Sequence, residues 1–132
     1  MKLIDVVNGT KALSRLSRQA LPLRISYQIN KAGIQMQEDY GFFARQEKSL
    51  LDSFRPTLID GSTVTFDSPE TAEEYRKAHA ELKEMEVDLE IRTLDIDIGM
   101  PIEISAQDLM TLEKAGIIRI VGDRDGEEDA NG

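Results

Sequence analysis

The sequence predicts an α+β protein that is mostly helical and is built around a long antiparallel helical hairpin. Two long segments, at about 22–54 and 69–86, carry apolar residues in the alternating three- and four-residue spacing of a narrow helical seam. The connection between them is short, so the two helices are expected to turn back and pack against each other. Further along the chain the apolar period becomes that of a strand, which adds a small C-terminal β element.

A short helix is expected before the hairpin, from about residue 3 to residue 19. The turn dipeptide Asn8-Gly9 falls within it, so the helix is expected to begin properly only after Thr10, which would cap it. A proline disfavours the helical conformation in the residue before it and suits the first position of a new helix. Pro22 is therefore expected to end the first helix and to open the second.

The second hairpin helix has the clearest start signal in the chain, at Asp67-Ser68-Pro69-Glu70. A capping residue, an early proline and an early acidic residue are typical of a helix N-terminus. Before it, the turn Asp60-Gly61 separates two β-prone runs, so Thr57-Leu58-Ile59 is expected to pair with Thr63-Val64-Thr65 as a small β-hairpin.

The C-terminal part alternates short strands with one short helix. Ser105 and Asp108 indicate a capped helix over 106–115 that Gly116 closes. Alternating or continuous apolar runs predict strands over 87–91, 94–98, 102–104 and 117–121. Residues 1–122 are thus expected to form a single domain, and the acidic residues 123–132 a disordered tail.

Composition excludes several classes of protein. There is no cysteine, which removes disulfides, thiolate catalysis and cysteine-based metal sites. The first residues lack a basic region followed by a long apolar run, and no apolar stretch approaches the ~20 residues that span a membrane. A soluble, cytoplasmic protein with no membrane association is expected.

No residue pattern indicates an enzyme, a cofactor or a metal site. The single histidine, His79, has no second ligand at helical spacing and is expected to be a partly exposed surface residue. Asp95 and Asp97 share one strand face, but outward polar residues on a half-buried strand explain them. The letters of residues 123–129 suggest a calcium loop, yet their order does not fit one. Phosphate loops, nucleophile elbows and zinc-helix motifs are absent from the sequence.

The charge is divided unevenly along the chain. The net charge is −9, yet residues 1–35 carry six basic residues against one acidic residue, and the remainder carries ten against 24. In one interpretation Arg15, Arg18, Arg24 and Lys31 pair internally with the acidic helix, since residues 70–90 hold eight carboxylates against three cations. In the other, the basic face docks an acidic partner or another copy of the protein. The candidate partner-binding residues are Arg15, Arg18 and Arg24 on the basic face, and Glu73, Glu74, Glu81 and Glu84 on the acidic face.

Several features together resemble a family of small tailed-phage and prophage proteins of unknown function. They are the leucines of the first helix, the corner Leu21-Pro22, an aromatic and a lysine in the next helix, Tyr27 and Lys31, and the late helix that starts at Ser105-Ala106-Gln107-Asp108-Leu109. Position 24 is arginine where lysine is commoner in that family. The resemblance covers most of the chain and implies a phage origin and a helical hairpin with a small β element, but no activity.

The expected function is that of a phage-encoded, non-enzymatic protein that acts by protein–protein contact. It would be a virion or tail assembly factor, or an inhibitor of a host machine or defence system. One alternative is an acidic nucleic-acid mimic that occupies a DNA- or RNA-binding groove. Another is a self-assembling structural protein in which a second copy completes the seams. Direct nucleic-acid binding is not expected, because the acidic remainder repels phosphate and the basic face offers only Tyr27 for stacking.

Overall fold

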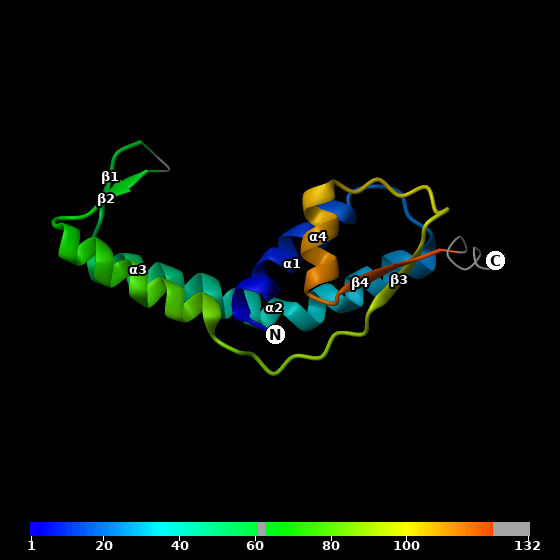
Figure 1. Ribbon diagram of the computed structural model, residues 1–132, viewed down its shortest axis with the longest axis horizontal. Coiled ribbons are helices and arrows are strands. Elements are labelled where there is room, and N and C mark those ends of the chain that lie inside the picture. Colours follow the sequence, from blue (N-terminus) through cyan, green and yellow to red (C-terminus); the bar gives the residue numbers. More distant parts are fainter. Residues whose placement is uncertain (61–62, 123–132) are drawn as a thin grey trace, which may run out of the picture.

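The computed structural model describes residues 1–60 and 63–122 and confirms the α+β class (Figure 1). Helix α2 (Leu23–Phe54) and helix α3 (Pro69–Glu84) form the expected antiparallel hairpin, and α3 lies along the C-terminal half of α2. The hairpin and the connection between its helices project beyond the N- and C-terminal elements, which gather around the N-terminal half of α2. None of the described helices combines the length and the apolarity needed to cross a membrane.

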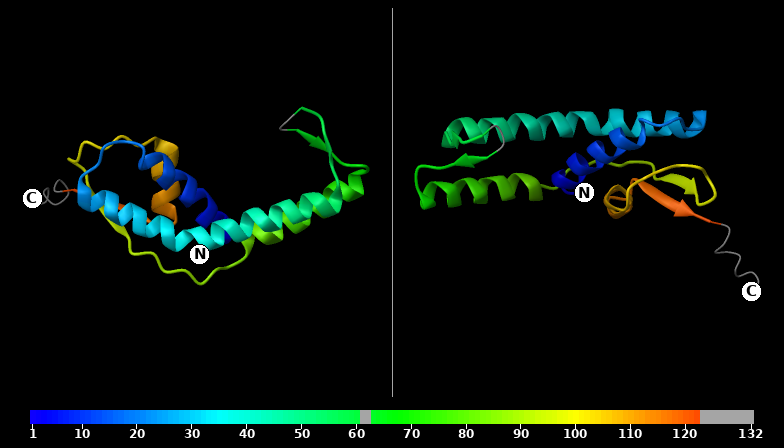
Figure 2. Two further views of the ribbon diagram at one scale, coloured as in Figure 1. Left: turned by 180° about the vertical axis from the view of Figure 1, so that it is seen from behind. Right: turned by 90° about the horizontal axis from the view of Figure 1, so that it is seen from above.

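The core lies where helix α1 (Leu3–Leu16) crosses α2. On the other side of α1 lie helix α4 (Ala106–Lys114) and the parallel strands β3 (Leu94–Asp97) and β4 (Ile118–Val121), as seen from above in Figure 2. Each of these elements buries apolar side chains in one cluster, which includes Val6, Leu13, Leu16, Ile25, Met36, Ile96, Leu112, Ile117 and Ile118.

Helix α1 is continuous from Leu3, so the expectation that it begins only after Thr10 is wrong. Tertiary packing overrides the turn signal at Gly9, which is buried in the middle of the helix. A Cβ atom at Gly9 would lie 2.5 Å from Ile117 Cδ1 and 3.2 Å from Met36 Cε. The glycine is therefore there for close packing, and Thr10 donates its hydroxyl hydrogen to the Val6 carbonyl instead of capping the helix.

The corner at Pro22 differs from the expectation in detail. Helix α1 already ends at Leu16, and Pro22 is the residue before α2, with an extended ψ of 143°, instead of its first residue. Its carbonyl accepts the first helical hydrogen bond from Ser26 N at 3.0 Å. Pro22 thus precedes the second helix, but it does not end the first.

The connection within the hairpin agrees with the prediction where it is described. Strands β1 (Thr57–Leu58) and β2 (Val64–Thr65) pair antiparallel, with Thr57 opposite Thr65. Gly61, in the expected turn, lies outside the described residues. Helix α3 starts as expected, because the Ser68 side chain accepts a hydrogen bond from Thr71 N.

In the C-terminal part the helix is predicted correctly and two of the strands are not. The Ser105 hydroxyl accepts from Asp108 N at 3.0 Å, and Gly116 adopts a φ of 75° after the helix. Residues 87–91 and 102–104 form no strand, because no neighbouring strand pairs with them. Their alternating apolar side chains still pack on the core, so the two-residue period reflects one-sided burial of an extended chain. The expected acidic tail, residues 123–132, lies outside the described part.

Candidate protein-docking surfaces on helix α2

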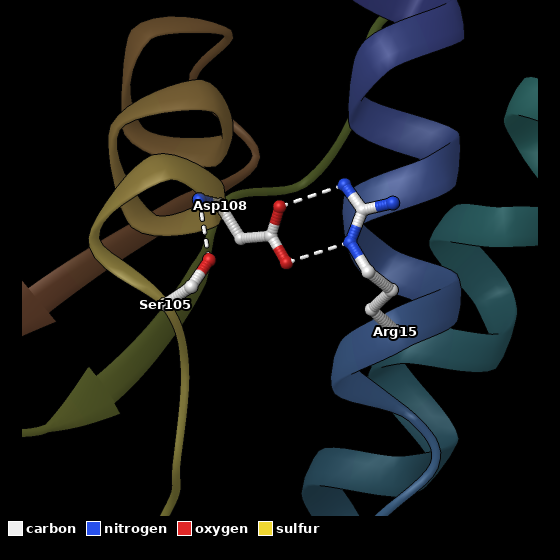
Figure 3. A network of polar contacts seen from close by, with 3 residues as sticks. All are labelled: Arg15, Ser105 and Asp108. Atoms are coloured by element: carbon white, nitrogen blue, oxygen red, sulfur yellow. Dashed lines mark hydrogen bonds and ion pairs between the residues drawn. The ribbon is translucent and has the colours of Figure 1, made fainter.

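Arg15 does not belong to an available basic face, because it is paired inside the molecule. Its guanidinium donates from Nε to Asp108 Oδ2 at 2.9 Å and from Nη2 to Asp108 Oδ1 at 2.7 Å (Figure 3). Asp108 is only 6% exposed. The hydrogen bonds from Arg15 hold the pKa of Asp108 below its usual value, and the same bonds raise the pKa of Arg15. The expected internal pairing of Arg15 with the acidic helix is wrong, since its partner is on α4.

Arg18 and Arg24 are exposed and form no ion pair with any described residue. Both lie at the end of the molecule away from α3, which packs on the C-terminal half of α2 through contacts such as Tyr75 with Phe54 (Figure 1). The internal interpretation of the basic face is therefore wrong for these residues too. The basic residue that does reach α3 is Lys2, at 2.6 Å from Glu84.

Two of the four residues proposed for the acidic face are engaged locally. Glu73 pairs with Arg76 on the same helix, and Glu84 pairs with Lys2. Each hydrogen bond to a cation lowers the pKa of the glutamate concerned. Glu74 and Glu81 are exposed and have no ion-pair partner among the described residues.

His79 is half-buried between the hairpin helices. Its Nε2 lies 2.9 Å from Glu47 Oε2, and its ring stacks on Tyr75 with 5.4 Å between centroids. Burial raises the pKa of the Tyr75 phenol, and the Glu47 carboxylate adds to this. Glu47 was not predicted from the sequence as a partner of His79, because it is 32 positions away on the other helix. Within residues 1–60 and 63–122 no group of three or more potential ligands is placed to hold a metal ion.

The outward carboxylates of β3 contribute to local structure. Asp95 binds Arg119, its register neighbour on β4, through both carboxylate oxygens. Asp97 accepts a hydrogen bond from Gly99 N at 2.9 Å. The interpretation of these residues as the polar face of a half-buried strand fits the burial pattern, in which Leu94 and Ile96 point inward.

Three exposed apolar residues of α2 lie on the side of the helix away from the core. Leu23, Tyr27 and Ile34 are 85%, 60% and 63% exposed. Their spacing of four and seven residues places them on one face, opposite the buried Ile25 and Met36. A helix that is apolar on two opposite faces is normally covered on both. The spacing of positions 23, 27 and 34 is a sequence signal of this second face, which the prediction of one core-facing seam did not include.

This exposed face borders a groove between α1 and α2, here called the outer groove. Its volume is about 620 Å³. None of its lining residues is ionised, and its two buried lining residues, Leu13 and Ile29, are apolar. The lining consists of Thr10, Leu13, Ser14, Ser17, Leu23, Ser26, Tyr27, Ile29, Asn30, Gly33, Ile34 and Gln37.

Tyr27 also borders a second groove, here called the basic groove, between α2 and residues 92–93. Its volume is about 300 Å³, and it is lined by three cations and no carboxylate. Lys31 Nζ lies 5.8 Å from the centre of the Tyr27 ring, and none of the three cations forms an ion pair within the described chain. The lining consists of Arg24, Tyr27, Gln28, Lys31, Ala32, Gln35, Arg92 and Thr93.

A third groove, the acidic groove, runs between α2 and α3 on the projecting part of the hairpin. Its volume is about 630 Å³, its floor is apolar, and the ionised residues that line it are Glu81 and Glu84. The lining consists of Phe42, Gln46, Leu50, Ala78, Glu81, Leu82, Glu84 and Met85.

No protein-family model, curated protein or solved structure matches this chain. The three grooves follow one long helix, α2. The outer groove is apolar with hydroxyl and amide groups, and the other two combine apolar and charged side chains. Such surfaces suit contact with another protein.

Proposed function

We propose that the chain is a phage-encoded, non-enzymatic protein that acts by holding another protein on the outer groove. The observation that carries the proposal is the exposed apolar face of α2, in particular Leu23 and Ile34. Covering a large apolar side chain contributes about 1.5–3 kcal/mol, so a few such residues can anchor a partner. The phage origin is supported by the resemblance to small tailed-phage proteins described above.

Contact, as opposed to catalysis, is supported by the way the titratable side chains are used. The carboxylate of Asp108 is bound by Arg15, and the imidazole of His79 is bound by Glu47 and stacked on Tyr75. Each of these contacts joins two elements of the fold, and neither group faces the outer groove. The outer groove itself offers apolar side chains and hydroxyls for binding.

The proposed setting is the host cytoplasm or the virion, and the role is that of an assembly factor or of an inhibitor of a host machine. The nucleic-acid mimic has weaker support. Mimicry needs a regular row of free carboxylates, but Glu73 and Glu84 are already paired with Arg76 and Lys2. Self-assembly is supported by a different observation, the opposite charges of the basic and acidic grooves.

The proposal is tested by recovering partners from phage-infected cells with the tagged full chain and quantifying them by mass spectrometry. The test variant is Leu23→Ser/Ile34→Ser. The matched control is Ile98→Ser/Met110→Ser, which removes two other exposed apolar residues outside the outer groove, at 61% and 67% exposure. We expect at least one protein that the wild type and the control recover and the test variant loses. An identical set of proteins from all three would overturn the proposal.

A further inference from the structure

The basic and acidic grooves lie on the same side of α2. Three lining residues of the basic groove, Arg24, Gln28 and Ala32, have counterparts eighteen positions later in the acidic groove. Those counterparts are Phe42, Gln46 and Leu50. Eighteen residues are about five helical turns, so each pair points in the same direction, about 27 Å apart along the axis.

The two grooves carry opposite charges. The basic groove has Arg24, Lys31 and Arg92 with no carboxylate. The acidic groove has Glu81, which is unpaired among the described residues, and Glu84, whose carboxylate Lys2 binds from α1. One side of α2 is therefore positive in its N-terminal half and negative in its C-terminal half. Such a surface is complementary to itself when two copies run in opposite directions.

We propose that two copies of the chain associate through this side of α2, antiparallel about a two-fold axis, with the basic groove of each copy on the acidic groove of the other. The axis forms the same contact twice and leaves no complementary surface open, so the assembly stops at a dimer. The surface is next to the outer groove and shares Tyr27 with it, but Leu23 and Ile34 are outside it. The inference therefore goes beyond the proposed function and does not depend on it.

The spacing of the charges supports the pairing. Arg24 and Lys31 are seven residues apart on α2, and Glu74 and Glu81, two exposed glutamates of α3, are also seven residues apart. Both separations correspond to about 10.5 Å along a helix. Tyr27 lies between the two cations and has an exposed ring. In the dimer this ring would contact the apolar floor of the acidic groove of the other copy, which Phe42, Leu50 and Leu82 form.

The net charge of the protein opposes dimer formation, so the salt dependence of the dimer is informative. Two copies of net charge −9 repel each other overall, so non-specific electrostatics oppose association. The proposed dimer depends on local pairing of opposite charges between the two grooves, which salt weakens. We expect the dissociation constant of the dimer to rise with sodium chloride concentration.

The experiment measures the mass of the full chain by sedimentation velocity, from micromolar to submillimolar concentration. The variants Arg24→Glu/Lys31→Glu and Glu74→Lys/Glu81→Lys are each expected to raise the dissociation constant at least about tenfold. Mixed together, they are expected to restore a one-to-one dimer, since each reversed groove then meets its complement. Arg45→Glu/Lys48→Glu is the matched control, because it makes the same charge change on α2 outside all three grooves and is expected to leave the dimer intact. Circular dichroism checks that every variant keeps the helical content of the wild type.

Three outcomes would overturn the inference: a wild-type monomer over the whole range, a dimer that the charge reversals do not weaken, or a mass that keeps growing with concentration. The proposed function is read separately with Leu23→Ser/Ile34→Ser, which is expected to remain dimeric while it loses the outside partner. A monomeric wild type that still recovers that partner would remove the dimer and leave the proposed function standing. A wild-type dimer that recovers no outside partner would support the dimer and overturn the proposed function.

Discussion

Arg15 on α1 and Asp108 on α4 form a two-pronged ion pair between residues 93 positions apart in the sequence. Asp108 is also the residue whose backbone N–H the Ser105 side chain binds at the start of α4 (Figure 3). The pair thus fixes the beginning of the last helix against the end of the first. Both helices border the core, so the contact orients the two ends of the described chain.

Replacing Asp108 by asparagine is expected to lower the free energy of unfolding by about 1–2 kcal/mol, because a buried, charge-assisted hydrogen bond is lost. Chemical denaturation measures the change. Asp95→Asn is the matched control, since it breaks an equally two-pronged pair with Arg119 that is exposed, and should cost about 0–1 kcal/mol. Equal losses in the two variants would show that burial of Asp108 adds nothing.

The stabilisation from Asp108 is expected to depend on pH. Arg15 holds the folded-state pKa of Asp108 below the ordinary value of 3.8, so the folded chain keeps this carboxylate ionised at lower pH than the unfolded chain does. Its contribution is therefore complete above that ordinary value and is lost as the pH falls through the folded pKa. Denaturation of the wild type and of Asp108→Asn at a series of pH values should show their difference shrinking in acid. A difference that stays constant down to about pH 3 would contradict this.

Gly9 and Gly33 are expected to respond oppositely to alanine, although both lie within helices. Alanine is favoured over glycine in a helix by about 1 kcal/mol. At Gly33 a Cβ atom meets nothing within 4 Å, so Gly33→Ala should stabilise the fold by about that amount. At Gly9 it would lie 2.5 Å from Ile117 Cδ1, and overpacking of about 1–3 kcal/mol should cancel or exceed the gain. Thermal unfolding of the two variants measures this, and a Gly9→Ala variant as stable as Gly33→Ala would be the contrary result.

The free energy of unfolding of the variant Leu23→Ser/Ile34→Ser is expected to lie within about 0.5 kcal/mol of the wild-type value, because both side chains are mostly exposed to water in the isolated protein. Thermal or chemical denaturation of the purified protein checks this. Ile25→Ser is the contrasting change on the same helix, since Ile25 is 1% exposed and its replacement should cost several times more. A large loss from the first variant would mean that the exposed face of α2 supports the fold itself.

Local signals in the sequence identified the elements whose stability is local. The caps at Ser68 and Ser105 and the left-handed glycine after α4 are confirmed, since each depends on residues within a few positions. The hairpin of α2 and α3 could also be predicted, because its seams are regular.

Errors arose where a distant segment decides the local structure. Gly9 signals a turn, but Ile117 and Met36 need the space beside a continuous helix. Residues 87–91 have the period of a strand, yet whether an extended segment joins a sheet depends on a neighbour that the segment does not specify. The parallel pairing of β3 with β4 was not anticipated for the same reason.

The candidate site shows the same division. The amount and sign of the charge were visible in the sequence, but its pairing was not. Arg15 belonged to the expected basic face and is bound to Asp108, whereas Arg92 was not considered and lines the basic groove with Arg24. An ion pair between residues 93 positions apart produces no periodic pattern in the sequence. The sequence alone therefore could not distinguish charged residues that pair within the molecule from those that are free to bind a partner.

Helix α3 has no fully buried residue, although it packs along α2 for its whole length. Amide hydrogens in such an element exchange with solvent through small openings that leave the core intact, because few buried contacts are broken. We therefore expect α3 to open more often than α1, although Leu82 packs against the buried Leu3, Val7 and Phe43. A protein bound along α3 would then slow amide exchange in that helix more than in the core.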